Sequence, residues 1–336
     1  MEPDRNRYLW DMSGAPDPEL QRWERELGRL CRKAPELVFP AREPRASKRG
    51  YYWLAAAACM LMALSMGLRW AWQPGAEWKA IALSGTPRID GRLIGSNGRI
   101  GVGGVLQTDN LSRAKLRMGL MGAIEIGPNT RVRLIATAAR RYRIELESGS
   151  IAARLWAPPG TLHVITPSAT AIDLGCAFGL QVDERGAGWL RVTSGWVEFQ
   201  LDDRKVIVPE GAAALTRPGV GPGTPFYDDA SGAFRSALER LDFGETGYGD
   251  ASALEVVLSE ARRKDVLTLL SLFSRLAPAQ RGMVFDRASQ LLPAPEGLTR
   301  EEAVDGMNIA GMDAWWKELG LGDAKNWLVN WRDLLR

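Results

Sequence analysis

An uncharged stretch in the first quarter of the chain constrains the fold more than any other feature. Residues 51–68 contain no Asp, Glu, Lys or Arg, and the apolar run continues past Arg69 to Trp72, shortly before Pro74. A helix that crosses a bilayer needs about 20 apolar residues, and Tyr and Trp favour its two ends. Aromatic residues stand at both ends of this stretch. The sequence therefore predicts a transmembrane helix over residues 51–72.

Two other structures are alternatives for the same stretch, a buried core helix and a signal peptide. A buried helix of this length in a soluble core would normally show a polar stripe, and residues 51–68 show none. A secretory signal peptide has only a short segment before its apolar part, whereas 50 residues precede this stretch. In addition, no small-x-small cleavage pattern follows the stretch. The transmembrane helix remains the favoured interpretation.

Charges beside the predicted span indicate its orientation. Four cations precede it closely, opposed only by Glu43: Arg42, Arg45, Lys48 and Arg49. Only Arg69 and Lys79 lie close behind it. Because cytoplasmic flanks are enriched in Lys and Arg, residues 1–50 are expected in the cytoplasm. Residues 73–336 are then periplasmic, and the chain is a single-pass protein of the inner membrane.

The cytoplasmic arm, residues 1–50, contains a predicted amphipathic helix of about 16 residues. Asp17 is a suitable cap, and Pro18 suits the first helical position. The apolar residues that follow at helical spacing are Leu20, Trp23, Leu27, Leu30 and Cys31. So short an arm rarely builds its own core. The stripe is expected to pack on the upstream residues 8–10 or the membrane surface, or to bind another cytoplasmic protein in a groove; the partner-binding candidates are Leu20, Trp23, Leu27 and Leu30.

From Trp78 onward the apolar pattern changes to a period of two. The alternating segments are 114–118, 124–126, 132–134, 144–146, 162–164, 190–192 and 197–199, with Gly-rich turns such as Ser148-Gly149 between them. Many short strands at near-regular spacing are typical of an all-β sandwich, barrel or solenoid. Ser194-Gly195 is interpreted as a tight hairpin between two of the strands.

Within this region, residues 80–216 resemble the FecR domain, the extracytoplasmic β domain of transmembrane regulators of extracytoplasmic-function sigma factors. The matching positions run from Gly104 and Thr108 through Gly122, Ile126 and Pro128 to the most specific part, Val164-Ile-Thr166-Pro167 with Ala169 and Ala171. Gly175, Phe178, Val192, Gly195 and Gly211 follow in the same order.

The resemblance implies a sandwich or solenoid-type β domain at 78–216 and a function as a sigma-factor regulator. Its matching positions are glycines, turn residues and alternating apolar residues, so they are expected to specify a fold and carry no chemistry. The six residues assigned this structural role are Thr166, Pro167, Gly175, Phe178, Gly195 and Gly211. One departure is Cys176, which stands where the family has Thr and is interpreted as structural, with an exposed reactive thiol as the alternative.

The C-terminal region, residues 226–336, is predicted to be a helical domain. A linker is expected over 217–225 from its Pro and Gly content. Helical spacing begins at Leu254, and Thr299 to Glu302 form a capping-box pattern. Asp313 is expected to cap a further helix. Charge separates the regions, since residues 73–224 hold 18 Lys and Arg against 13 Asp and Glu, whereas residues 225–336 hold 13 against 18.

Composition narrows the functions. A net charge of +3 gives no indication of nucleic-acid binding. His163 is the only histidine, and the three cysteines fall in three predicted compartments, so the sequence predicts no enzyme activity, no metal site, no cofactor and no intramolecular disulfide. The predicted function is a single-pass regulator that relays an envelope signal to a cytoplasmic sigma factor, with an envelope or outer-membrane protein as the external partner. The alternative is an envelope adaptor, in which the N-terminal residues serve only as a membrane anchor.

Overall fold

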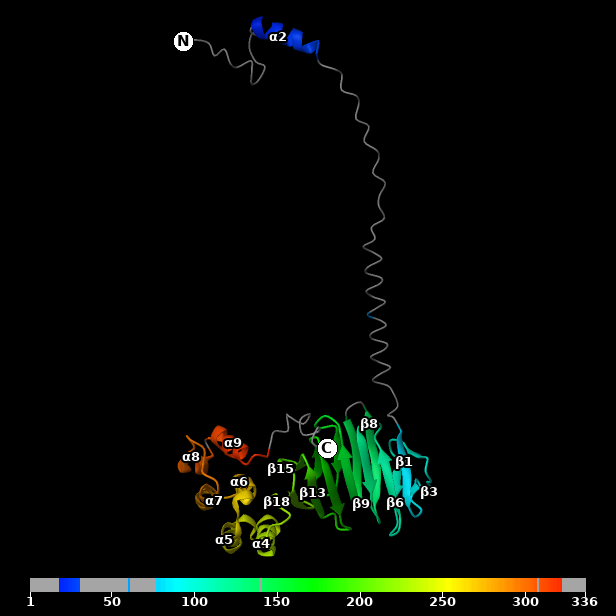
Figure 1. The fold of residues 1–336 in the computed structure, drawn as a ribbon, viewed down its shortest axis with the longest axis vertical. Coiled ribbons are helices and arrows are strands. Elements are labelled where there is room, and N and C mark those ends of the chain that lie inside the picture. Colours follow the sequence, from blue (N-terminus) through cyan, green and yellow to red (C-terminus); the bar gives the residue numbers. More distant parts are fainter. Residues whose placement is uncertain (1–17, 31–59, 61–76, 139–140, 307, 322–336) are drawn as a thin grey trace. The chain divides into compact units, whose positions relative to one another are not determined.

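The computed structural model describes residues 18–30, 60, 77–138, 141–306 and 308–321 (Figure 1). By internal contacts the chain forms two units, Met1–Leu68 and Arg69–Arg336. No helix in the described part of the chain is both long enough and apolar enough to span a bilayer. The predicted span over 51–72 lies outside the described residues except for Met60, so it stays a prediction.

The first unit contains helix α2 (Pro18–Gly28), which begins at the proline expected to open it. Eleven residues long, it is shorter than the predicted 16 residues. Leu30 lies in the turn that follows, where its N–H donates to the carbonyl of Leu27 at 2.9 Å. None of the helix side chains is buried. Cys31 and the alternative packing partner at residues 8–10 lie outside the described residues.

The second unit begins with two β-sheets, which we call sheet A and sheet B. Sheet A consists of β1 (Trp78–Ser84), β4 (Gly98–Ile100), β6 (Arg113–Arg117), β7 (Gly122–Ile126), β12 (Ala177–Val182), β13 (Gly188–Ser194), β16 (Ala212–Arg217), β17 (Gly221–Pro222) and β18 (Phe226–Tyr227). Sheet B consists of β2 (Arg88–Ile89), β3 (Arg92–Leu93), β5 (Val105–Gln107), β8 (Arg131–Ala138), β10 (Leu162–Ile165), β11 (Thr170–Asp173), β14 (Trp196–Leu201) and β15 (Arg204–Pro209). The long strand β9 (Arg141–Leu155) belongs to both.

Strand β9 joins the sheets because its direction changes at Gly149. Before this glycine Leu146 pairs with Val132 of sheet B, and after it Ile151 pairs with Ile126 of sheet A. Gly149 has φ +97°, and a Cβ there would lie 2.4 Å from the Cα of Thr130. Both the positive φ and the short distance to Thr130 exclude a side chain at this position. The sequence-based interpretation of Ser148-Gly149 as a turn is therefore wrong: the position is a bend within a continuous strand.

The core of the β region lies between the sheets. The inward side chains of both sheets form one cluster that includes Leu116, Ile124, Leu134, Leu146 and Phe199, each 2% exposed or less. Their alternation with exposed residues is the period-two pattern of the sequence, so the predicted strands in this region are confirmed. Burial of such side chains contributes about 1.5–3 kcal/mol each to folding.

The predicted hairpin at Ser194-Gly195 is wrong. Strand β13 pairs with β12 and β16 of sheet A, whereas β14 pairs with β11 and β15 of sheet B, so the chain changes sheets at Gly195. Both strands have buried inward side chains, which a two-stranded hairpin cannot cover on its own. The positive φ of +73° at Gly195 allows the sharp corner that was interpreted as a hairpin turn.

Helices follow the sheets, as predicted (Figure 1). They are α4 (Gly232–Phe243), η1 (Gly247–Gly249), α5 (Ala251–Glu260), η2 (Arg263–Asp265), α6 (Val266–Leu272), η3 (Phe273–Arg275), α7 (Pro278–Leu291), α8 (Arg300–Asp305) and α9 (Ile309–Glu318). Thr299 and Glu302 form the predicted capping box of α8. Asp313 caps no helix: α9 already begins at Ile309, because Asn308 accepts a hydrogen bond from the Gly311 N–H and opens the helix earlier.

The helical region packs against sheet A, and the predicted linker is exposed only in part. Within 217–225, residues 217–220 are exposed and residues 221–225 are buried. Ala213 and Leu215 of β16 project into the helical core, so the helices cover the outer face of sheet A at its β16 end. The sequence could not show this burial, because Gly and Pro are common both in loops and in short edge strands.

A buried carboxylate joins the two regions. Asp242 of α4 accepts hydrogen bonds from the N–H of Thr224 at 2.6 Å, from the hydroxyl of Tyr248 at 2.6 Å and from Arg275 at 3.0 Å. Arg204 of β15 reaches the same carboxylate and the Tyr248 hydroxyl. Burial, and then the Asp242 charge, raise the pKa of Tyr248 to about 12, so the hydroxyl remains a donor at neutral pH.

Candidate functional site

The first candidate binding surface is the apolar face of α2. Trp23, Leu27 and Leu30 recur at spacings of four and three residues, which places them on one side of the helix axis. Their exposed fractions are 65%, 56% and 78%, and Leu20, one turn earlier, is half-buried. Exposed Trp and Leu on one helix face form the kind of stripe that binds in a groove of a partner protein. The structure thus places the four predicted partner-binding residues together.

The six residues assigned to the structural motif lie at turns or in the core. Phe178 is buried in the β core, and the hydroxyl of Thr166 closes the turn around Pro167 by donating to the carbonyl of Ala169 at 2.7 Å. The three glycines have positive φ: Gly175 at +90°, Gly195 at +73° and Gly211 at +75°. None of the six presents a chemically reactive group.

Cys176 lies in a buried turn with Asp173. One carboxylate oxygen of Asp173 accepts from the N–H groups of Gly175 and Cys176 and from the Cys176 thiol at 2.6 Å, while the other is buried without a hydrogen-bond partner. Burial raises the pKa of Asp173 to about 6, and burial followed by the Asp173 charge raises that of the thiol well above its usual range. A fully buried neutral thiol is a poor nucleophile, which favours the structural interpretation over the reactive one.

The second candidate surface is the outer face of sheet A. The strand register aligns one row of outward residues across six strands, in the order Ile81, Lys115, Glu125, Ala152, Gly179 and Arg191. In the next row Lys79 pairs with Arg117, and Ala123 pairs with Arg154. In these two rows, cations of β1, β6, β9 and β13 lie beside Ala and Gly of β7, β9 and β12, with Glu125 on β7.

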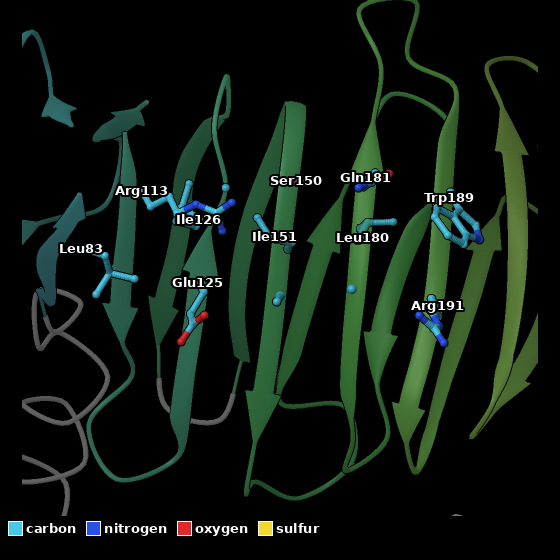
Figure 2. A pocket seen from close by; sticks show the side chains of 13 residues that line it. Leu83, Arg113, Glu125, Ile126, Ser150, Ile151, Leu180, Gln181, Trp189 and Arg191 are labelled. Carbon is cyan, nitrogen blue, oxygen red and sulfur yellow. The ribbon is translucent and has the colours of Figure 1, made fainter. Parts of the chain in front are cut away.

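Two adjoining hollows follow this floor. One, of about 330 Å³, extends toward Trp189 and Arg113, and Figure 2 shows Trp189 and Arg191 on one strand with Arg113 and Glu125 some strands away. The other, of about 830 Å³, extends toward Trp156 and Arg154. Both include Glu125, Ala152, Gly179 and Arg191, so they form one continuous groove.

Most cations of the groove have no charged partner. Lys115 lies 3.0 Å from Glu125, and Arg191 forms an ion pair with Asp228 beside the helical region. Arg113, Arg117 and Arg154 are exposed and form no hydrogen bond or ion pair with the other residues that the structure describes. The field above this face is therefore positive, and the sheet can bind negatively charged groups.

The remaining chemically interesting residues form no site. Over the described ranges, no three His, Cys, Asp or Glu side chains come together in an arrangement that could hold a metal ion. His163 is half-buried on β10, and burial lowers its pKa. It pairs across the sheet with Ile172 and Arg143, neither of which can act as a general base.

The sequence-based reasoning missed the groove. Each of its cations alternates with a buried residue, as in Ala114-Lys115-Leu116, and this pattern by itself predicts only a half-exposed strand. The alternation does show which side chains point outward. What it lacks is the register across β6, β7, β9, β12 and β13, which brings residues as distant as 115 and 191 into one row.

Comparison with known proteins gives little support at the level of the family. No family model matches the chain, and no curated protein matches its sequence. Two crystal structures, at 1.65 and 2.50 Å resolution, of a "putative anti-sigma factor" from Parabacteroides distasonis ATCC 8503 are similar to it, each with a TM-score of 0.33 and 14% identity. Each match covers 40% of this chain and 64% of the other, less than two thirds of its length. The resemblance to the FecR domain remains a prediction.

Proposed function

We propose that this protein is a single-pass membrane regulator that binds a cytoplasmic sigma factor through α2 and receives an envelope signal through residues 73–336. The observation that carries the proposal is the apolar face of α2: Trp23 and Leu27 are exposed on a short helix, and Leu30 is exposed in the turn that follows it. A helix of this length is marginal in water by itself. It gains stability when this face is buried against a partner.

The membrane span and the sigma-regulator class come from sequence. The uncharged residues 51–72 and the positive flank before them support a cytoplasmic α2. The resemblance of residues 80–216 to the FecR domain supports a sigma factor as the partner. The regulator is proposed to act by binding alone, with no catalytic part for His163 or Cys176, and an envelope or outer-membrane protein is its proposed external partner.

Capture of the full-length chain from its host membrane tests the proposal. The chain carries a C-terminal tag, and bound proteins are identified by mass spectrometry. We expect a sigma factor with the wild-type chain and at least a tenfold lower yield with Trp23→Asp, because a buried Trp in an interface contributes about 2 kcal/mol or more. Gln21→Asp is the matched control, since it places the same residue on the polar side of α2.

An envelope adaptor is the second candidate, and the open groove of sheet A is the observation that favours it. The adaptor would need the first unit only as an anchor. Replacement of residues 1–45 with an unrelated cytoplasmic sequence distinguishes the two functions. A regulator loses its effect on transcription, whereas an adaptor retains its envelope function.

A further inference from the structure

We propose that the groove on the outer face of sheet A binds an acidic polysaccharide, a chain of sugars that carry carboxylates. The inference extends the proposed function, because it uses the predicted position of residues 73–336 outside the cytoplasm. It concerns a different surface from α2, and the two can be tested separately.

Charge is the first argument. Five cations among the described residues line the two hollows: Arg113, Lys115, Arg117, Arg154 and Arg191. Lys79 lies beside Arg117 in the strand register. Of the acidic side chains that the structure describes, Glu125 alone lines the hollows. An Arg guanidinium binds a carboxylate through two parallel hydrogen bonds, which makes unpaired Arg residues well suited to a carboxylated ligand.

Shape is the second argument. Ala123, Ala152 and Gly179 supply short side chains on β7, β9 and β12, and Glu125 and Arg154 lie beside them in the same two rows. Four strand spacings separate β6 from β13, or about 19 Å. A linear polymer that lies across the strands can pass over the short side chains and meet Lys115, Arg154 and Arg191 along its length.

The two tryptophans are the third argument. Trp156 and Trp189 are 40% and 39% exposed, and they belong to the two different hollows. A Trp ring presents a flat apolar face with a polar edge. Pyranose rings offer a matching flat face of C–H groups, so two separated tryptophans can stack on sugars of one chain.

The arrangement differs from that of a protein interface. The buried centre of such an interface is apolar and poor in charge, with polar groups at the rim. Here Glu125 of β7 and Arg154 of β9 lie between β6 and β13. The described strands beneath the groove, β7, β9, β12 and β13, each pair on both sides, so a peptide strand could not pair with them there. Single-stranded nucleic acid also combines charge with flat rings, but the predicted external location favours the polysaccharide.

Binding of polygalacturonate to the full-length chain in detergent micelles tests the inference. Isothermal titration compares wild type with the double variant Arg117→Ala/Arg154→Ala. We expect the variant to bind about tenfold more weakly than wild type. We expect a similar loss of affinity for wild type when NaCl rises from about 50 to 200 mM, because the protein's cations displace counterions from the polyanion when they bind it. Trp156→Ala is expected to weaken binding at both salt concentrations.

The matched control is Arg92→Ala/Arg143→Ala, which removes two exposed cations from sheet B. It is expected to bind like wild type, and equal melting temperatures verify folding of each variant. An equal loss of polygalacturonate affinity in the sheet A and sheet B double variants would overturn the assignment to the outer face of sheet A. Equal binding of neutral dextran, or tighter binding of polyglutamate or single-stranded DNA, would overturn the ligand class. Loss of sigma-factor capture with groove binding intact contradicts only the proposed function.

Discussion

At the scale of single residues, Asp173 makes stability depend on pH. Its pKa of about 6 lies above the ordinary value of 3.8 because burial disfavours the charged form. The folded protein therefore holds this proton more tightly than the unfolded chain does. The stabilising contribution is complete below pH 4 and is lost as pH rises through 6.

We predict that Asp173→Asn removes this pH dependence. Asparagine keeps an oxygen for the N–H groups of Gly175 and Cys176 but cannot ionise. The difference in free energy of unfolding between variant and wild type should change by about 3 kcal/mol between pH 4 and pH 7, in favour of the variant at the higher pH. Urea unfolding followed by Trp fluorescence measures it, and parallel pH profiles for the two proteins would be inconsistent with the assignment.

Gly195 and Gly219 distinguish two reasons why a position requires glycine, namely a positive φ and a lack of space for a Cβ. Its φ is +73°, and a Cβ there would lie 2.3 Å from the carbonyl oxygen of Gly175. Gly219 has the same φ with nothing within 4 Å of a Cβ. Gly219→Ala should cost about 1 kcal/mol from backbone strain alone, and Gly195→Ala at least 2 kcal/mol more from the clash. Equal melting temperatures for the two variants would contradict this account.

At the scale of helices and strands, the sequence predicts those elements whose apolar residues recur at a regular period. The strands of the β core and the capping box at Thr299 are examples. Helix α4 lies within 226–336, the region predicted to be helical, but helical spacing is expected only from Leu254, although Phe234, Ala237, Leu238 and Leu241 show it too. The junction around Asp242 could not be predicted, since its partners lie up to 38 residues away along the chain and share no spacing.

The Asp242 network predicts a cooperative junction between the sheets and the helices. Asp242→Ala removes the shared acceptor and leaves Arg275, whose side chain is 10% exposed, as a buried uncompensated charge. We expect a loss of about 3–5 kcal/mol in unfolding free energy. Glu239→Ala, which breaks the exposed pair with Arg217 at the same junction, should cost less than about 1 kcal/mol.

Chemical denaturation of both variants measures this difference. Limited proteolysis of the helices, at residues that follow α4, provides a second measurement. Comparable stability of the two variants would show that the network does not join the regions.

At the scale of the whole molecule, we predict that residues 1–50 and residues 73–336 lie on opposite sides of a membrane. Charge and hydropathy of residues 42–72 carry that prediction. Single cysteines at Leu27 and at Leu120, which is 98% exposed, can report on it. The background is Cys31→Ser/Cys59→Ser, and the buried Cys176 is expected to remain unlabelled.

A membrane-impermeant maleimide added to intact spheroplasts should label Leu120→Cys fully and Leu27→Cys only after permeabilisation. Labelling of both positions in intact spheroplasts, or the reverse pattern, would contradict the predicted topology.

Photocrosslinking in living cells tests the central claim most directly, namely that the apolar face of α2 binds a sigma factor. A photoreactive amino acid replaces Leu27 in the full-length chain, and the same amino acid at Gln21, on the polar side of the helix, is the control. We predict a crosslinked product that contains a sigma factor from position 27 and none from position 21. Equal crosslinking from both positions, or products from position 27 that contain only lipid or other proteins, would contradict the account.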